Sequence, residues 1–165
     1  MPNAFSTHIT NPATAYPQAW ERASKVKLLV LDVDGVLTNG QVWIGADGKE
    51  SLKAFDIQDG LGIKLLEQSG IPTAIITGRH SKMVLARCEE LGIKHVHMGV
   101  ENKALAFNEV LKTLGLSASD CAVMGDDWPD LQMMKNAGLR ICPAQGHEAV
   151  KEFVHFVTNR TGGDS

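Results

Sequence analysis

The chain has 165 residues and a mass of 17.8 kDa, enough for one domain of ordinary size. Hydrophobic residues make up 44% and charged residues 21%, proportions that exclude a disordered or fibrous protein. The formal net charge of −3 offers no basic surface to nucleic acid or to an anionic membrane, and no apolar run approaches the roughly 20 residues that span a bilayer. The 3 cysteines form no C-x-x-C pair, so we expect reduced, buried thiols in a cytoplasmic protein.

Residues 1–24 are polar and interrupted by Pro2, Pro12 and Pro17, which predicts a loose N-terminal arm ending in a short helix over Gln18–Ala23. Its start has neither the basic nor the apolar region of a secretory signal. From residue 25 to residue 165 we expect one domain, in which short apolar runs alternate with amphipathic stretches. The runs predicted as strands are Leu28–Val33, Thr73–Ile76, His95–Met98, Ala122–Met124, Leu139–Ile141 and His155–Val157.

The stretches between these runs carry helix start and stop signals. We expect helices from Asp59, an N-cap candidate, to Gly70, from Ser81 to Gly92, from near Asn102 to Gly115, and over Trp128–Asn136. Glycine just past a helix adopts the left-handed conformation at little cost. Strands and helices alternating at this spacing predict an α/β fold, a doubly wound, Rossmann-like parallel sheet with helices on both faces.

One segment breaks the alternation. The runs Gln41–Ile44 and Lys49–Phe55 flank Asp47-Gly48, a dipeptide that favours a two-residue type I′ turn. We therefore predict a β-hairpin over residues 40–55 that projects from the sheet directly after the first strand. Trp43 and Ile44 would be exposed in a monomer, so we expect them to pack on a neighbouring subunit.

Polar side chains follow four of the predicted strands. Ligands of an open parallel sheet bind beyond the carboxyl ends of its strands, so we expect these groups to meet at one rim. They are Asp32 and Asp34 after the first strand, Thr77 and Arg79 after the second, Lys103 after the third, and Asp126 and Asp127 after the fourth.

The residue types at this rim indicate phosphoryl chemistry. Bare carboxylates at Asp32, Asp34 and Asp126 would repel one another, and Mg²⁺ relieves such repulsion. A hydroxyl, a lysine and helix N-terminal amides bind a phosphate dianion. A carboxylate beside a metal-held phosphate can attack phosphorus, and a second acid can protonate the leaving oxygen and then deprotonate water. Each group alone has an ordinary structural explanation, but all of them in this order predict a phosphatase.

This set resembles the haloacid dehalogenase superfamily of aspartyl-phosphate phosphatases over about residues 25–163. The resemblance is carried by Asp32-Val33-Asp34-Gly35-Val36-Leu37-Thr38, Ile76-Thr77-Gly78-Arg79, Lys103, and Gly125-Asp126-Asp127 with Asp130. It implies that Asp32 is the nucleophile, that Asp34 is the general acid and base, and that Thr77 and Lys103 hold the phosphoryl oxygens. It also implies Mg²⁺ held by Asp32, the Asp34 carbonyl and Asp126, with Asp127 and Asp130 in supporting or structural roles.

Neither place where the superfamily inserts a cap domain has room for one. The residues between Thr38 and Asp59 make the hairpin, and one helix and one strand use up the chain between Thr77 and Lys103. The site of a monomer would then be open. Water exclusion and substrate selection must therefore come from a macromolecular substrate or from neighbouring subunits.

The capless pattern with this hairpin resembles the family of 3-deoxy-D-manno-octulosonate 8-phosphate phosphatases. The segment Phe55–Lys64 and Arg87 carry this closer likeness, although the family often has Arg at Gln58 and Lys64 and Asp at Asn39. The likeness implies a Mg²⁺-dependent homotetramer of lipopolysaccharide precursor synthesis. It also implies contacts with the sugar acid or its phosphate by Asp34, Asp56, Ile57, Gln58, Asp59, Gly60, Lys64, Arg79, Arg87 and Lys103.

Other interpretations are open to test. A phospho-receiver domain would carry its adjacent acid pair at the first strand and its lysine late, the reverse of the order here. A non-catalytic relative kept for assembly would normally have lost Asp32 or Asp34. A phosphatase for another sugar-acid phosphate, such as a sialic-acid-type 9-phosphate, would use the same motifs and differ only in its specificity residues.

Overall fold

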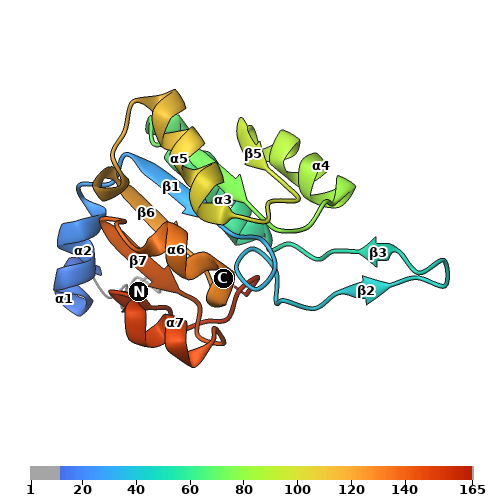
Figure 1. The fold of residues 1–165 in the computed structure, drawn as a ribbon. Helices are drawn as coiled ribbons and strands as arrows, with labels where there is room; N and C mark the ends of the chain where they lie inside the picture. The colour runs from blue at the N-terminus through green and yellow to red at the C-terminus, as the bar shows by residue number, and fades with distance from the viewer. Residues whose placement is uncertain (1–11, 165) are drawn as a thin grey trace, which may run out of the picture.

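The computed structural model describes residues 12–164, which form a six-stranded parallel sheet covered by helices on both faces (Figure 1). The strands stand in the order β5-β4-β1-β6-β7-β8. Each hydrogen-bonded pair runs parallel, so the predicted doubly wound α/β class is confirmed. The strand bounds are β1 (Leu28–Leu31), β4 (Thr73–Ile76), β5 (His95–His97), β6 (Cys121–Met124), β7 (Leu139–Cys142) and β8 (Phe156–Val157).

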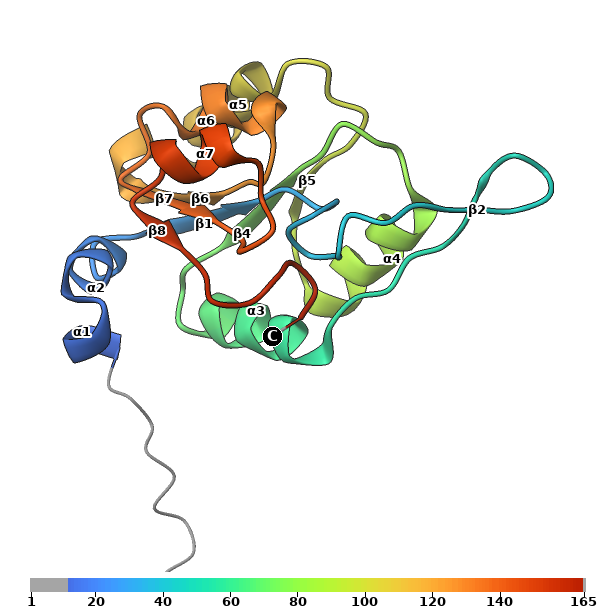
Figure 2. The ribbon, with the colours of Figure 1, turned by 90° about the horizontal axis from the view of Figure 1, so that it is seen from below.

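The two faces of the sheet carry separate cores, each under its own helices (Figure 2). Leu28 and Val30 of β1 pack in one cluster with Phe107, whereas Leu31 packs in the other with Ile63. Successive strand residues point to opposite faces, which is why the strands are continuous apolar runs. The helices are α3 (Ile57–Gln68) and α4 (Lys82–Leu91) on one face, and α5 (Lys103–Leu114), α6 (Leu131–Met134) and α7 (Glu148–Phe153) on the other.

Helix α3 begins earlier than the sequence predicts. The Asp56 carboxylate accepts hydrogen bonds from the backbone N–H groups of Gln58 and Asp59, at 2.6 and 3.3 Å. The predicted N-cap at Asp59 is therefore wrong. Asp56 has the extended backbone of a capping residue, and Asp59 already lies in the first turn.

The predicted helix over Trp128–Asn136 is shorter and divided. A 3₁₀ turn, η2 (Trp128–Asp130), comes first, and α6 follows it and ends at Met134. Asp127 and Asp130 form a capping box that fixes the 3₁₀ turn, so the chain tightens before it becomes α-helical. A second 3₁₀ turn, η1 (Ala118–Asp120), precedes β6.

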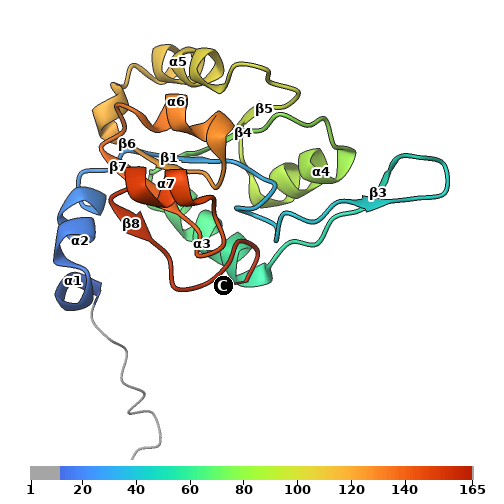
Figure 3. The same ribbon diagram turned by 60° about the horizontal axis from the view of Figure 1, so that its bottom comes forward.

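The predicted hairpin is present as β2 (Trp43–Ile44) and β3 (Glu50–Leu52), and it projects from the body of the domain (Figure 3). Its turn is not the predicted type I′. Gly48 has a φ of 75°, its N–H donates to the Gly45 carbonyl at 3.0 Å, and Asp47 keeps a negative φ. A type I′ turn needs positive φ at both central residues, and the longer loop places only glycine there.

Helices α1 (Pro12–Ala15) and α2 (Pro17–Ala23) lie beside the β8 edge of the sheet. The Tyr16 ring packs edge-on against Phe156, with 4.9 Å between ring centroids, and its hydroxyl accepts from Asn159 Nδ2 at 2.7 Å. Residues 1–11 of the predicted arm lie outside the described residues, and the domain boundary near residue 25 stays a prediction. The three cysteines, Cys88, Cys121 and Cys142, are free and buried. No helix among residues 12–164 is long and apolar enough to cross a membrane.

Candidate active site

The ends of β1, β4 and β6 and the start of α5 surround a cavity of about 430 Å³. This position matches the topological switch point, because the strand order runs outward from β1 in both directions. The lining includes every residue predicted as catalytic or metal-binding, namely Asp32, Asp34, Thr77, Lys103 and Asp126. It also includes Arg79, a predicted substrate contact.

The chain turns sharply after β1, so Asp32 stands just beyond the end of the strand. Its N–H donates to the Met124 carbonyl at 3.1 Å, which ties it to β6. The Val33 carbonyl accepts from the N–H groups of Val36, Leu37 and Thr38, at 3.2, 2.9 and 3.1 Å. Because of this turn, β1 ends at Leu31, two residues before the predicted end at Val33.

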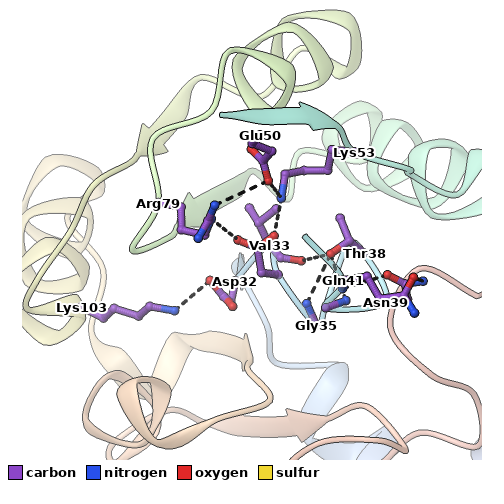
Figure 4. A network of polar contacts seen from close by, with 12 residues as sticks. Asp32, Val33, Gly35, Thr38, Asn39, Gln41, Glu50, Lys53, Arg79 and Lys103 are labelled. Atoms are coloured by element: carbon purple, nitrogen blue, oxygen red, sulfur yellow. Dashed lines mark hydrogen bonds and ion pairs between the residues drawn. The ribbon is translucent and has the colours of Figure 1, made fainter. Parts of the chain in front are cut away.

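The loop that carries Asp34 passes so close to Asp126 that only glycine fits at position 35. Gly35 has a φ of 95°, and a Cβ there would lie 2.0 Å from Asp126 Oδ2. The buried Thr38 hydroxyl accepts from the Gly35 N–H at 3.4 Å (Figure 4). On the other side, a Cβ at Gly162 would lie 2.1 Å from the Gly35 carbonyl oxygen. Close contacts on two sides therefore hold this loop.

Lys103 joins two acids at the wall of the cavity. Its Nζ lies 2.8 Å from Asp32 Oδ1 and 2.7 Å from Asp130 Oδ1, and all three side chains are buried. Burial raises the pKa of Asp32 to about 6, although Lys103 beside it acts in the opposite direction. Burial also disfavours the charged form of Lys103, but the two acids outweigh this and raise its pKa. Lys103 is therefore a cation at neutral pH, aimed at Asp32.

Three acids crowd together beside this pair. Carboxylate oxygens of Asp32, Asp126 and Asp130 lie within 4.8 Å of one another. Burial, followed by the charges of Asp32 and Asp130, raises the pKa of Asp126 to about 7. Such crowding is what a divalent cation with oxygen ligands relieves. The donor set of the cavity therefore suits Mg²⁺.

The contacts of Asp130 distinguish it from the other two acids. Its Oδ2 accepts from the N–H groups of Asp126 and Asp127 at 3.0 and 3.2 Å, and its Oδ1 accepts from Lys103 at 2.7 Å. Both oxygens of Asp130 are therefore committed to the protein. Asp130 therefore anchors Lys103 and the turn after β6, and the metal-binding roles of Asp32 and Asp126 stay predictions.

Thr77 follows β4 and is buried in the cavity lining. Its N–H donates to the His97 carbonyl at 2.9 Å, and its own carbonyl accepts from the Val100 N–H at 3.1 Å. These bonds extend the pairing of β4 with β5 by one step. The Thr77 side chain therefore sits on a fixed backbone beside Asp32 and Lys103.

The remaining predicted substrate contacts lie near the start of α3 and do not line this cavity within one chain. Arg87 Nη2 donates to the Asp56 carbonyl at 2.9 Å, and a Cβ at Gly60 would lie 2.3 Å from that nitrogen. Ile57 is 80% exposed. Substrate binding by these residues stays a prediction. They are Asp56, Ile57, Gln58, Asp59, Gly60, Lys64 and Arg87.

Two charged residues that no sequence motif indicated lie beside Asp34, the predicted general acid. Lys53, directly after β3, contacts the Asp34 carboxylate, and Glu50 Oε1 lies 2.9 Å from Lys53 Nζ. In the sequence, a Glu and a Lys three residues apart on a hairpin are typical of a solvent-exposed pair. The strand-end argument misses them because the hairpin lies outside the parallel sheet.

Comparison with known proteins shows which family the chain belongs to. The model of haloacid dehalogenase-like hydrolases matches residues 61–138. The chain is 41% identical over 155 residues to 3-deoxy-D-manno-octulosonate 8-phosphate phosphatase of Salmonella typhimurium, covering 92% of this chain and 82% of that protein. It is 42% identical over 142 residues to the Escherichia coli K12 phosphatase of the same name, covering 86% of this chain and 75% of that protein.

Solved structures agree with the sequence relatives. The phosphatase of this name from Moraxella catarrhalis, in complex with magnesium, phosphate and KDO, has a TM-score of 0.85 at 44% identity, covering 89% of this chain and 84% of that one. The one from Yersinia pestis has a TM-score of 0.86 at 39% identity, covering 89% and 79%. Identity of this degree over most of both chains shows that the protein belongs to the haloacid dehalogenase superfamily and, within it, to the family of 3-deoxy-D-manno-octulosonate 8-phosphate phosphatases.

Proposed function

We propose that this protein hydrolyses 3-deoxy-D-manno-octulosonate 8-phosphate to the free sugar acid and phosphate, in the supply of lipopolysaccharide precursors. The observation that carries the proposal is the buried pair of Asp32 with Lys103, facing Asp126 in a cavity of the fold that these phosphatases share. The names of the relatives favour this substrate over a sialic-acid-type 9-phosphate. Asp32 and Asp34 are both in place, which argues against a non-catalytic assembly domain.

The chemistry follows from the placement of two acids. A carboxylate oxygen of Asp32 bonds to phosphorus, and the bond from phosphorus to the sugar oxygen breaks as Asp34 protonates that oxygen. Water then attacks the aspartyl-phosphate and gives its proton to Asp34, which releases phosphate and restores Asp32. Thr77 and Lys103 hold the phosphoryl oxygens during both steps.

The residues of the cavity fit Mg²⁺, as the crowding of Asp32 and Asp126 indicates. These two carboxylates and the Asp34 carbonyl would hold the ion, which when bound offsets charge on the transferring phosphoryl group. Lys103 supplies positive charge from the protein itself. Asp130 is left out of the proposed metal ligands because both of its carboxylate oxygens already accept hydrogen bonds, one from Lys103 and the other from the N–H groups of Asp126 and Asp127.

The proposed reaction predicts selective, metal-dependent turnover. We expect phosphate release from 3-deoxy-D-manno-octulosonate 8-phosphate to exceed that from a panel of common sugar phosphates by at least about 100-fold in kcat/KM. EDTA should abolish it, and added Mg²⁺ should restore it. Turnover of other sugar phosphates alone would contradict the proposed substrate but not the proposed chemistry. Absence of turnover by the folded, Mg²⁺-supplied protein would contradict the proposal that it is a phosphatase.

We further propose a cytoplasmic homotetramer in which neighbouring subunits complete each site. Large apolar side chains are exposed on the hairpin and on α3, including Trp43 at 56%, Ile44 at 58% and Ile57 at 80%. Exposed apolar surface of this kind marks an interface. A neighbour seated there could also bring the Asp56–Gly60 segment of one chain to the cavity of another, where a single chain leaves it remote.

Replacing Trp43 and Ile44 together by serine should therefore dissociate the assembly. The matched control is Leu105→Ser, because Leu105 is 61% exposed on α5, which covers the face of the sheet opposite to α3 (Figure 2). In sedimentation, the hairpin variant should move to the single-chain mass of 17.8 kDa, and the control should keep the mass of the unmodified protein. An unchanged mass for the hairpin variant would contradict the proposed interface.

A further inference from the structure

The hairpin sends one lysine back to the catalytic acids. Lys53 Nζ contacts Asp34 Oδ1. It also lies 2.9 Å from Glu50 Oε1, and Figure 4 shows these two side chains meeting. We propose that Lys53 is a positioning residue, held by Glu50, which holds Asp34 Oδ1 so that a proton carried on Oδ2 can pass to the leaving oxygen. This inference rests on the proposed function, because it assigns to Lys53 a part in the acid step of Asp34.

The Lys53 side chain is buried, so its charge depends on partners within the protein. Its side chain is 1% exposed, and lysine is almost never fully buried unless it is paired. A buried ammonium is unfavourable unless acceptors meet its charge and its three N–H donors. Asp34 and Glu50 provide two carboxylates for it. Removal of the lysine would leave both acids facing each other's charge without that cation.

Arg79 faces the same two acids from the other side. Its Nε lies 3.8 Å from Asp34 Oδ2 and its Nη2 lies 4.0 Å from Glu50 Oε1, both longer than the Lys53 contacts. The two Asp34 oxygens thus face different cations. Because the Arg79 side chain is 49% exposed, it can turn to the substrate, whereas the buried Lys53 keeps its contact with Asp34.

The origin of Lys53 in the chain gives this contact a second consequence. Asp34 belongs to the loop that leads from β1 into the hairpin, and Lys53 belongs to the segment that leads from β3 to α3. The Lys53–Asp34 contact therefore joins the two ends of the hairpin at the cavity. The orientation of the Asp34 side chain therefore depends on how the two segments at the base of the hairpin pack together. The residues at the strand ends do not determine that packing by themselves.

The choice of substrate separates positioning of the acid from simple support of the fold. An alkoxide leaving group such as a sugar oxygen needs a proton as the bond to phosphorus breaks, whereas p-nitrophenolate leaves without one. The ratio kcat/KM reports steps up to transfer of the phosphoryl group to Asp32, before the second use of Asp34. A lysine that only supports the hairpin would affect both substrates equally.

The test compares Lys53→Met, Lys53→Arg and the control Lys49→Met, an exposed lysine of the same hairpin. For Lys53→Met we expect kcat/KM to fall at least about 100-fold with 3-deoxy-D-manno-octulosonate 8-phosphate and less than about tenfold with p-nitrophenyl phosphate. Lys53→Arg should recover part of the sugar-phosphate activity. Lys49→Met should match the unmodified protein with both substrates.

Equal losses with the two substrates, or no loss with either, would overturn the role of Lys53 while the unmodified enzyme remains active. If Lys53→Met does not fold, Glu50→Gln provides the same comparison, because it removes the partner that holds Lys53 and should shift the ratio in the same direction. An unmodified protein that hydrolyses neither substrate would instead overturn the proposed function, and this inference with it.

Discussion

Asp32→Asn should reduce phosphate release by at least about 10⁴-fold in kcat, because the amide cannot form the aspartyl-phosphate. Asparagine has nearly the same shape, so the cavity and the contact of Lys103 with Asp130 should persist. The matched control is Asp47→Asn at the exposed hairpin turn, which keeps an acceptor for the Lys49 N–H. Residual activity of the Asp32 variant above about one hundredth of the control would contradict the nucleophile assignment.

The same substitution should not reduce stability at neutral pH. Burial raises the pKa of Asp32 from 3.8 to about 6, so the folded protein binds this proton more tightly than the unfolded chain does. The stability that this proton provides is fully present below the unfolded pKa and is lost as the pH rises through the folded pKa. In Mg²⁺-free buffer, thermal unfolding of Asp32→Asn at pH 7.5 should occur at or above the temperature of the unmodified protein. A lower unfolding temperature would contradict the direction of this shift.

Much of the fold follows from local patterns in the sequence. The predicted strand Thr73–Ile76 has the same bounds as β4, because it is a short apolar run between turn residues. The stop signals at Gly92 and Gly115 are confirmed as left-handed C-caps of α4 and α5. Catalytic candidates could be chosen for the same reason, since parallel strands bring their carboxyl ends to one rim whatever the details of packing.

The failures lie where two local choices are nearly equal or where distant segments meet. Asp56 and Asp59 are both good capping residues, and the Arg87 contact with the Asp56 carbonyl is among the tertiary features that no local pattern reveals. Similarly, Asp47-Gly48 fits either a two-residue or a longer turn. Lys53 gains its significance only when the hairpin closes against the loop after β1, which is a property of the folded chain.

Lys103→Met should lower kcat/KM by about 10³-fold and destabilise the Mg²⁺-free protein by about 3–5 kcal/mol at neutral pH. Lys103 Nζ lies 2.8 Å from Asp32 and 2.7 Å from Asp130, so its loss leaves buried acids without that cation. The pKa of Lys103 is raised above 10.5 by those acids despite its burial, so its stabilising effect is present at neutral pH and is lost only in alkali. Thermal unfolding and steady-state kinetics beside Lys112→Met, an exposed lysine of α5, measure both effects.

The response of this variant to Mg²⁺ distinguishes a missing charge from a missing contact. Without Lys103, the pKa of Asp32 should rise further, because the lysine acts to lower it, and the acid limb of the activity profile should move to higher pH. The crowded acids should then bind a divalent cation more tightly, since no neighbouring ammonium competes for Asp32. Mg²⁺ should therefore raise the unfolding temperature of Lys103→Met more than that of the Lys112→Met control. Equal increases in the two variants would mean that Lys103 acts through its shape rather than its charge, and that Asp32 and Asp126 hold the ion independently of it.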